Sequence, residues 1–367
     1  MAQTPLQQLA EHGQSVWLDF LSRKFVKDGE LAAMVERGVV GVTSNPTIFQ
    51  SAIAEGDAYD DQIRRLAGEL DDPKEIFWRL AVDDIRDACD VLRPVYDRSG
   101  GDGFVSLEVD PTLAYDAATT HSEAVRLHGL VDRPNLLIKI PATEPGLQAI
   151  EETIAAGISV NVTLIFSLER HRGVAEAYVR GLERYAQAGG DLGAIKSVAS
   201  FFVSRVDSEA DKRIEQLGGH DRLLGTLAIA NAKLAYQLFL EVFSGERWEA
   251  LAAKGASVQR PLWASTSTKN PKYRDVLYVE ELIGPDTVNT MPTGTVDAFE
   301  DHGELRGDTI LEDVDGAKAV FAAFADAGID YDDVVATLER EGVEKFEASF
   351  ADLVAGLQGK LKALVAA

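Results

Sequence analysis

Short apolar runs recur along the chain, and in most of them polar side chains occupy every second position toward the end. The runs cover residues 16–20, 41–46, 105–110, 135–141, 160–164, 196–202, 261–266 and 287–291. In the third run Ser106 and Glu108 lie opposite three aliphatic residues, and in the fifth run Asn161 and Thr163 do the same. Because strand side chains alternate between two faces, these runs predict strands with one apolar face and one face of reactive groups.

Helical patterns separate these eight runs. We expect helices over residues 1–14, 30–38, 46–98, 112–130, 145–156 and 167–188, two helices within 204–245 and a helical tail from about 315 to 367. In the long stretch 46–98, Pro73 suits a first helical position. Regular alternation of strands and helices indicates a (β/α)8 TIM barrel with additional N-terminal and C-terminal helices. No Gly- or Ser-rich linker divides the chain, so we expect one domain over 1–367, with the barrel over about 15–310 and a C-terminal helical extension over about 315–367.

The run 135–141 has one lysine, Lys139, among leucines and isoleucines. A buried lysine is disfavoured as the ammonium ion, and a neutral amine can attack a carbonyl to form a Schiff base. This run alone favours the plainer interpretation, a side chain that reaches from the strand end to water. The polar strand ends elsewhere favour a site, because parallel barrel strands bring their carboxyl ends to a common mouth.

Composition narrows the function classes. The chain has 367 residues and a formal net charge of −24, which argues against non-specific binding of nucleic acid or anionic membranes. A phosphorylated small molecule remains compatible, because a few Arg or Lys residues reverse the field within one cleft. The single Cys89 excludes an internal disulfide, and no apolar run resembles a signal peptide or a membrane span, so we expect a cytoplasmic protein.

Other candidate motifs carry less weight. Gly100–Gly103 precedes a strand, whereas a dinucleotide-binding loop follows one. His121 and His128 lie two helical turns apart, but no further ligands cluster with them, so we expect neither a metal nor another cofactor. Lys196 lies at the start of its strand, which indicates a barrel-floor or rim position.

Four motifs together resemble the transaldolase family. They are Thr43-Ser44-Asn45-Pro46, the run Leu137 to Thr143, the run Asn161 to Ser167, and the run Ser200 to Asp207. Each motif alone is weakly specific, whereas the four on strands two, four, five and six are strongly specific. The resemblance extends from Asp19 to about Met291.

The resemblance implies reversible transfer of a dihydroxyacetone unit in the non-oxidative pentose phosphate pathway. The donor is fructose 6-phosphate or sedoheptulose 7-phosphate, and the acceptor is erythrose 4-phosphate or glyceraldehyde 3-phosphate. The implied catalytic residues are Lys139 for the Schiff base, Glu108 acting through a water that Thr163 holds, and Asp19 for the C4-hydroxyl proton. The implied substrate-binding residues are Asn45, Asn161, Ser200, Phe202 and the phosphate ligand Arg205.

One departure concerns the phosphate site. The family often has a second arginine after strand seven, where this chain has Lys269, with Ser265 or Ser267 nearby to donate a hydroxyl. A lysine binds phosphate as a point charge without the bidentate fork of arginine. The second phosphate ligand therefore stays open at this stage.

Two alternatives to a transaldolase remain. A fructose 6-phosphate aldolase uses the same lysine but releases free dihydroxyacetone, and the resemblance places a tyrosine of that enzyme at Phe202. A phenylalanine has no hydroxyl to assist hydrolysis, so Phe202 favours transfer. A non-catalytic phospho-sugar-binding barrel would not require Lys139, Glu108, Thr163 and Asp19 together. The sequence leaves open a monomer or a homodimer.

Overall fold

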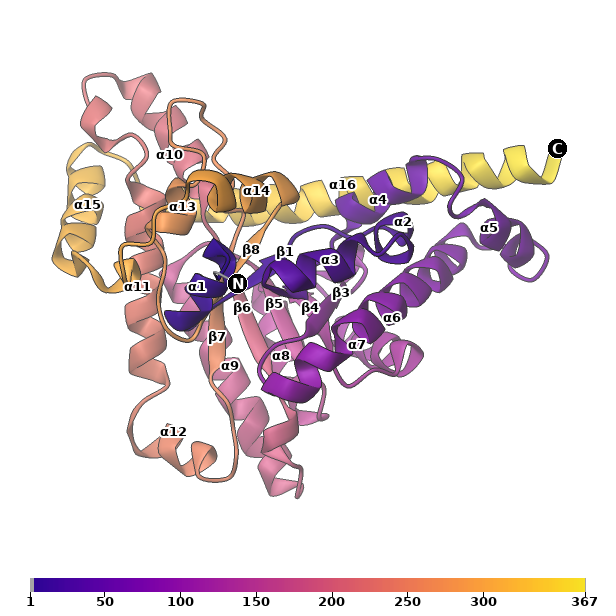
Figure 1. Ribbon diagram of the computed structural model, residues 1–367. Coiled ribbons are helices and arrows are strands. Elements are labelled where there is room, and N and C mark those ends of the chain that lie inside the picture. The colour runs from indigo at the N-terminus through magenta and orange to yellow at the C-terminus, as the bar shows by residue number, and fades with distance from the viewer. Residues whose placement is uncertain (1–2, 367) are drawn as a thin grey trace.

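Eight parallel strands close into a barrel at the centre of the computed structural model, which describes residues 3–366 (Figure 1). The strands are β1 (Gln14–Leu18), β2 (Val39–Val42), β3 (Phe104–Glu108), β4 (Leu136–Pro141), β5 (Val160–Ile165), β6 (Ser197–Phe202), β7 (Gln259–Ala264) and β8 (Thr287–Met291). Each pairs with its neighbours in sequence, and β8 closes onto β1. The predicted barrel is confirmed.

The strands are short and almost completely buried. Every strand residue is buried except Val40 and Arg260, which are partly exposed. Inside the barrel the Trp17 indole covers Gly41, where a Cβ atom would approach the ring to 2.5 Å. A larger residue at position 41 would therefore displace the tryptophan from β1.

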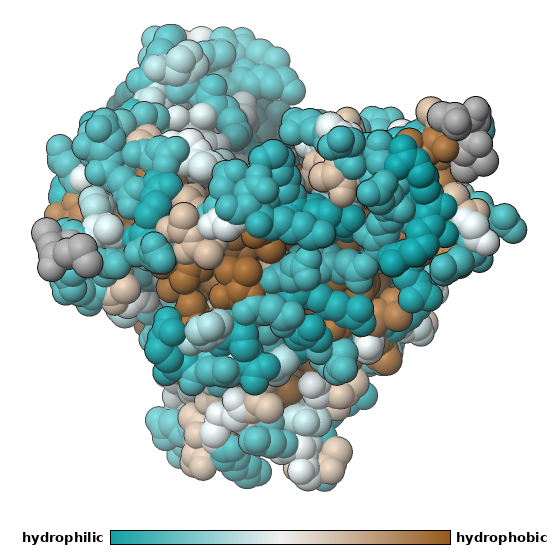
Figure 2. All heavy atoms as spheres, turned by 45° about the vertical axis from the view of Figure 1, so that its right-hand side comes forward, coloured by the Kyte–Doolittle hydropathy of each residue, from teal (hydrophilic) through white to brown (hydrophobic). Residues whose placement is uncertain are grey.

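Helices connect the strands. They are α1 (Pro5–Glu11), α2 (Arg23–Lys27), α3 (Glu30–Arg37), α4 (Pro46–Ala54), α5 (Asp60–Ala67), α6 (Pro73–Ser99), α7 (Ala117–Val131), α8 (Glu144–Ala155), α9 (Leu168–Gln187), α10 (Ser204–Leu217), α11 (Leu227–Val242), α12 (Gly245–Ala252), α13 (Leu277–Glu280) and α14 (Thr293–His302). The face in Figure 2 is mostly hydrophilic, with hydrophobic residues visible in recessed areas.

Two predicted elements differ from the structure. The stretch 46–98 is not one continuous helical region but three helices, because Gly56 has a φ of 68° and a second break lies between Gly68 and Asp72. Pro73 begins α6 as predicted, behind Asp72 as its cap. The first two strands also end earlier than expected, so Asp19 and Asn45 lie in the loops that follow β1 and β2.

The C-terminal tail forms two helices, α15 (Val314–Asp326) and α16 (Tyr331–Ala366), separated by Gly328 with a φ of 82°. Over its 36 residues α16 spans about 54 Å and packs against α10, α4, α5 and α6 (Figure 1). Phe346, Phe350, Leu353 and Leu357 form its buried face, at the three- and four-residue spacing of a helical stripe. Within residues 3–366 no helix, including α16, is long and apolar enough to cross a membrane.

Candidate active site

A lysine and a glutamate meet at the carboxyl ends of β3 and β4. The strand register places Glu108 directly beside Lys139, and Lys139 Nζ lies 3.2 Å from Glu108 Oε2. The ammonium group also donates to the Ser44 carbonyl at 3.2 Å. Both side chains are almost fully buried, at 6% and 3% exposure. The sequence predicted their shared face, and the register now makes them neighbours.

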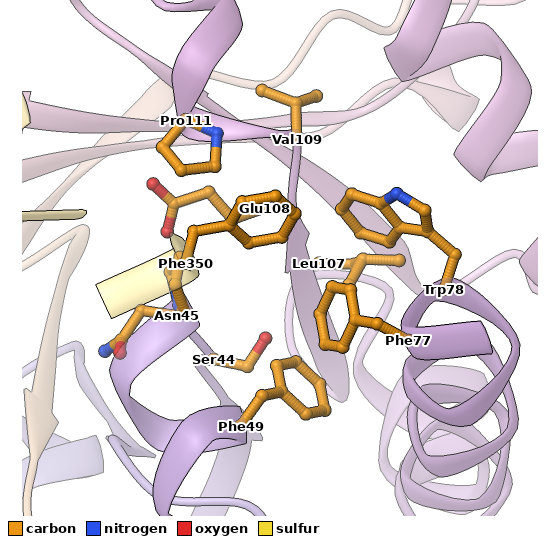
Figure 3. Close-up of a pocket in the computed structure, with 11 residues that line it drawn as sticks. Ser44, Asn45, Phe49, Phe77, Trp78, Leu107, Glu108, Val109, Pro111 and Phe350 are labelled. Atoms are coloured by element: carbon orange, nitrogen blue, oxygen red, sulfur yellow. The ribbon is translucent and has the colours of Figure 1, made fainter. Parts of the chain in front are cut away.

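An apolar wall stands beside Glu108. Figure 3 shows the carboxylate beside Pro111 and the Phe350 ring. The rings of Phe49, Phe77 and Trp78 lie beyond Phe350 and line the same small cavity. Burial raises the pKa of Glu108, although the positive charge of Lys139 acts against this shift. A glutamate with a raised pKa next to an amine is suited to accept and return a proton.

β5 presents Thr163 and Asn161 beside the lysine, because Lys139 pairs with Asn161 and Pro141 with Thr163 in the register. The Thr163 hydroxyl is buried and has no hydrogen-bond partner among residues 3–366. The strand is irregular at this point, and Leu164 has a φ of 59°. A positive φ at a leucine is costly and is typical of functional sites.

A chain of hydrogen bonds fixes the Asn161 amide. Its Nδ2 donates to Ser106 Oγ at 2.9 Å, and its Oδ1 accepts from Ser200 Oγ at 2.7 Å. Ser106 on β3 and Ser200 on β6 therefore hold the amide of β5 in a single orientation. Ser200 reaches the main cavity, and Asn161 lies directly behind it.

Asp19 and Asn45 occupy the loops after β1 and β2. Asp19 Oδ1 accepts from Thr43 Oγ1 at 2.8 Å, and Thr43 Oγ1 also lies 2.8 Å from Thr290 Oγ1. Asn45 is the N-cap of α4, and its side-chain oxygen accepts from the Ile48 amide at 3.0 Å. Because the Asn45 side-chain oxygen accepts this bond at the start of the helix, its NH₂ group remains available to donate to a ligand.

The opposite side of the mouth is cationic. The Arg205 guanidinium lies 5.1 Å from the Phe202 ring centroid, and Lys269 Nζ donates to Ser267 Oγ at 2.7 Å. Burial lowers the pKa of both Arg205 and Lys269. The hydroxyl oxygens of Ser265 and Ser204 lie 2.9 Å apart, and Ser265 has a φ of 57°. This side of the mouth suits an anion.

One cavity of 200 Å³ joins the two sides. Its lining includes Asp19, Thr43, Asn45, Lys139, Thr163, Ser200, Phe202, Arg205, Ser265, Ser267, Lys269, Thr290, Lys345 and Phe346. Of the residues predicted for the site, Glu108 and Asn161 stand behind this lining, each in contact with a residue that forms it. The structure thus brings all twelve predicted site residues together.

Sequence reasoning missed Lys345 and Phe346, which α16 brings to the same cavity. The Phe346 ring centroid lies 5.8 Å from Lys139 Nζ. In the sequence, Phe346 stands out only as part of the apolar stripe of a helix. A stripe predicts that a helix face is buried but does not predict what it covers.

The fold and this site define a (β/α)8-barrel protein with a lysine-centred cavity at the carboxyl ends of its strands. Residues 16–357 match the family described as Transaldolase/Fructose-6-phosphate aldolase. The chain is 55% identical to Transaldolase 1 of Streptomyces coelicolor, over 97% of this chain and 94% of the relative. It is 56% identical to the transaldolase of Thermobifida fusca, over 96% of each chain. The chain belongs to the transaldolase/fructose-6-phosphate aldolase family.

Proposed function

We propose that the protein is a transaldolase, which moves a dihydroxyacetone unit from a ketose phosphate to an aldose phosphate through a Schiff base on Lys139. The observation that carries the proposal is the buried pair of Lys139 and Glu108, 3.2 Å apart, at the wall of a cavity with an anion-binding side. The relatives at 53–56% identity bear the name transaldolase. This supports the activity, and the residue roles below are part of the proposal.

The first half of the reaction forms the Schiff base. A proton passes from Lys139 to Glu108, and burial, which raises the pKa of Glu108, favours the resulting neutral pair. The amine attacks the C2 carbonyl of the ketose, and the carbinolamine hydroxyl leaves as water with a proton that Glu108 supplies. A water held by the Thr163 hydroxyl relays this proton, and the buried oxygen of Thr163 is available for it because it has no hydrogen-bond partner among residues 3–366.

The second half breaks and remakes a carbon–carbon bond. Asp19 removes the proton of the C4 hydroxyl, the C3–C4 bond breaks, and its electron pair moves into the iminium to give an enamine. The aldose leaves, a new aldose binds, and the enamine attacks its aldehyde while Asp19 returns the proton. Water then releases the product and regenerates Lys139. The iminium is the electron sink, so this chain needs no metal for the step.

We assign the binding residues to two parts of the substrate, the dihydroxyacetone unit and the phosphate group. Asn45 and Ser200 hold the hydroxyls of the dihydroxyacetone unit, and Phe202 forms an apolar wall beside it. Asn161 orients Ser200 from behind the cavity lining. Arg205, Lys269, Ser265 and Ser267 bind the phosphate group. Arg205 lies at the start of α10, where backbone N–H groups also favour an anion.

A second candidate activity is that of a fructose 6-phosphate aldolase, the other member of the family name. Phe202 weighs against it, because the side chain lines the cavity without a hydroxyl that could protonate the enamine. A non-catalytic sugar-phosphate binder is disfavoured further, because it would have no use for the Lys139–Glu108 pair.

The test supplies fructose 6-phosphate with and without erythrose 4-phosphate and follows glyceraldehyde 3-phosphate. A transaldolase produces it continuously only when the acceptor is present, and about one equivalent per site without it. Continuous production without acceptor, together with free dihydroxyacetone, would indicate the aldolase. No production in either assay, with the sugar phosphate still bound, would indicate a binder.

The proposal also covers the cellular compartment, the binding partners and the oligomeric state. The only cysteine, Cys89, is buried and its pKa is raised by burial, which makes it an inert packing residue suited to a reducing cytoplasm. Sugar phosphates are the partners that the site requires. We propose a monomer or a homodimer, and the elution volume from a calibrated column distinguishes them.

A further inference from the structure

The C-terminal helix forms one wall of the candidate active site. Lys345 and Phe346 of α16 line the cavity that also contains Lys139 and Arg205. One turn earlier, Gly342 packs so closely on the end of β5 that a Cβ atom there would lie 3.1 Å from Leu164. The helix is therefore held against the mouth, and this packing fixes the backbone position of Lys345 above the cavity.

Lys345 has an available partner that it does not use. Glu341 precedes it by four residues, the favoured spacing and order for an ion pair on a helix. Among residues 3–366, however, no carboxylate lies within ion-pair distance of Lys345, of Lys269 or of Arg205. The positive charges of Arg205 and Lys345 both lower the pKa of Lys269, which places the three cations in one local field.

Three cations that face one cavity without paired carboxylates repel one another. Asp19 is the only carboxylate among the lining residues, and Thr43 already donates to it. The whole chain carries a formal charge of −24, so the cavity stands out as a positive patch in a negative surface. A doubly charged anion would relieve this repulsion.

We propose that Lys345 is a third cationic ligand for the phosphate group of the sugar substrates, so that α16 takes part in substrate recognition. The inference rests on the proposed function and extends it to a residue outside the barrel. Lys345 is exposed at the rim, whereas Arg205 is half-buried, so Lys345 attracts and retains the phosphate and does not act on the reacting carbons.

The experiment is the variant Lys345→Met, which keeps the length of the side chain and removes its charge. We expect KM for fructose 6-phosphate and erythrose 4-phosphate to rise about fivefold, with kcat unchanged, at low ionic strength. The increase should shrink at high salt. KM for unphosphorylated erythrose should stay the same, and Lys345→Arg should restore the parent values.

Lys362→Met is the matched control. It removes the same charge from the same helix, but Lys362 lines a separate groove beside Leu70 and Pro73. Its KM values should equal those of the parent. Equal KM values in Lys345→Met and the parent, or an equal rise with unphosphorylated erythrose, would overturn the role of Lys345.

A binding measurement separates this inference from the proposed activity. Sorbitol 6-phosphate has no carbonyl and cannot form the imine, so calorimetry with it reports phosphate recognition alone. A parent that binds this probe about fivefold more tightly than Lys345→Met supports the inference even if turnover is absent. Equal affinity in the two proteins contradicts it even if the parent is an active transaldolase.

Discussion

The Arg260 cluster at one end of the barrel and the three cations at the other differ in how far their polar partners lie within the protein. At the amino-terminal floor, the Arg260 guanidinium donates to four oxygens, on Gly101, Asp102, Ser15 and Thr287. Asp102 in turn accepts from Ser15 and from the Trp17 indole. At the mouth, the Thr163 hydroxyl has no partner among residues 3–366, and the three cations have no carboxylate within ion-pair distance.

This difference distinguishes polar groups that stabilise the fold from polar groups that remain available to a ligand. A buried polar group without a partner costs free energy, so a network such as the floor recovers this cost within the protein. At the mouth, the free-energy penalty of unpaired polar groups remains in the unliganded protein, and a bound substrate can offset it by pairing with them. Two lysines, one within β4 and one directly before β6, illustrate the contrast. Lys196 donates to Ser257 at the floor, as its predicted position suggested, whereas Lys139 contacts a catalytic candidate.

The largest expected effect separates these two lysines. Lys139→Arg should abolish turnover and keep the fold, because a guanidinium stays charged and cannot attack a carbonyl. Reduction with borohydride in the presence of fructose 6-phosphate should add one dihydroxyacetone unit to the peptide 136–140 of the parent and none to this variant. Mass spectrometry after digestion checks the site.

Lys196→Arg is the matched variant at the floor, and it should keep both turnover and labelling. Thermal melting shows whether either substitution disturbs the fold. Labelling at Lys196 or Lys269, or turnover in Lys139→Arg, would show that the mouth lysine has been misassigned.

The next effect concerns the floor. Arg260→Met should lower the free energy of unfolding by about 3 kcal/mol, because it leaves the partly buried Asp102 carboxylate without its cation and removes four hydrogen bonds. Denaturant titration measures the loss. The folded fraction should keep the KM and kcat of the parent, since Arg260 lies at the end of the barrel opposite Lys139. A large loss of kcat at unchanged stability would break the division between the two ends.

A smaller effect is expected at the phosphate side of the mouth. Arg205→Ala should weaken binding of phosphorylated sugars by about 1.5–3 kcal/mol, the range for a hydrogen bond to a charged group. The measurement is KM for fructose 6-phosphate against KM for unphosphorylated dihydroxyacetone, which should change little. An equal loss on both compounds would argue that Arg205 supports the structure and does not bind phosphate.

The last effect tests a buried carboxylate on α10. Asp207 on α10 accepts from the Ala228 amide and the Tyr278 hydroxyl, both at 2.7 Å, yet burial raises its pKa to about 7. The unfolded chain releases this proton near pH 4, so the native state binds more protons between about pH 4 and 7. The contribution of Asp207 to stability is therefore present below pH 4 and is lost as pH rises through 7.

Asp207→Asn removes this titration. The pH dependence of the melting temperature should become shallower between pH 4 and 7, so the stability of the variant relative to the parent should rise with pH across this range. Melting curves at pH 4, 6 and 8 measure the difference. Parallel curves for the two proteins would contradict the titration of Asp207 in this range.

Much of the candidate site was predictable, because a strand alternates with period two whatever surrounds it. Glu108, Lys139 and Thr163 each follow from parity within their own run, and barrel closure brings them together. Boundaries were less predictable. The long helical stretch after Asn45 breaks near Gly56, where the backbone turns to a positive φ that a helical pattern does not reveal.

The sequence by itself determined the barrel, the order of its strands and which side chains face its axis, because these depend on local periodicity and on the chirality of parallel connections. Only the tertiary structure decided which groups are already satisfied and where the tail docks. Asn45 caps α4, Asn161 is bound on both sides, and α16 brings Lys345 to the cavity. These outcomes depend on contacts between segments far apart in the chain, which no local pattern encodes.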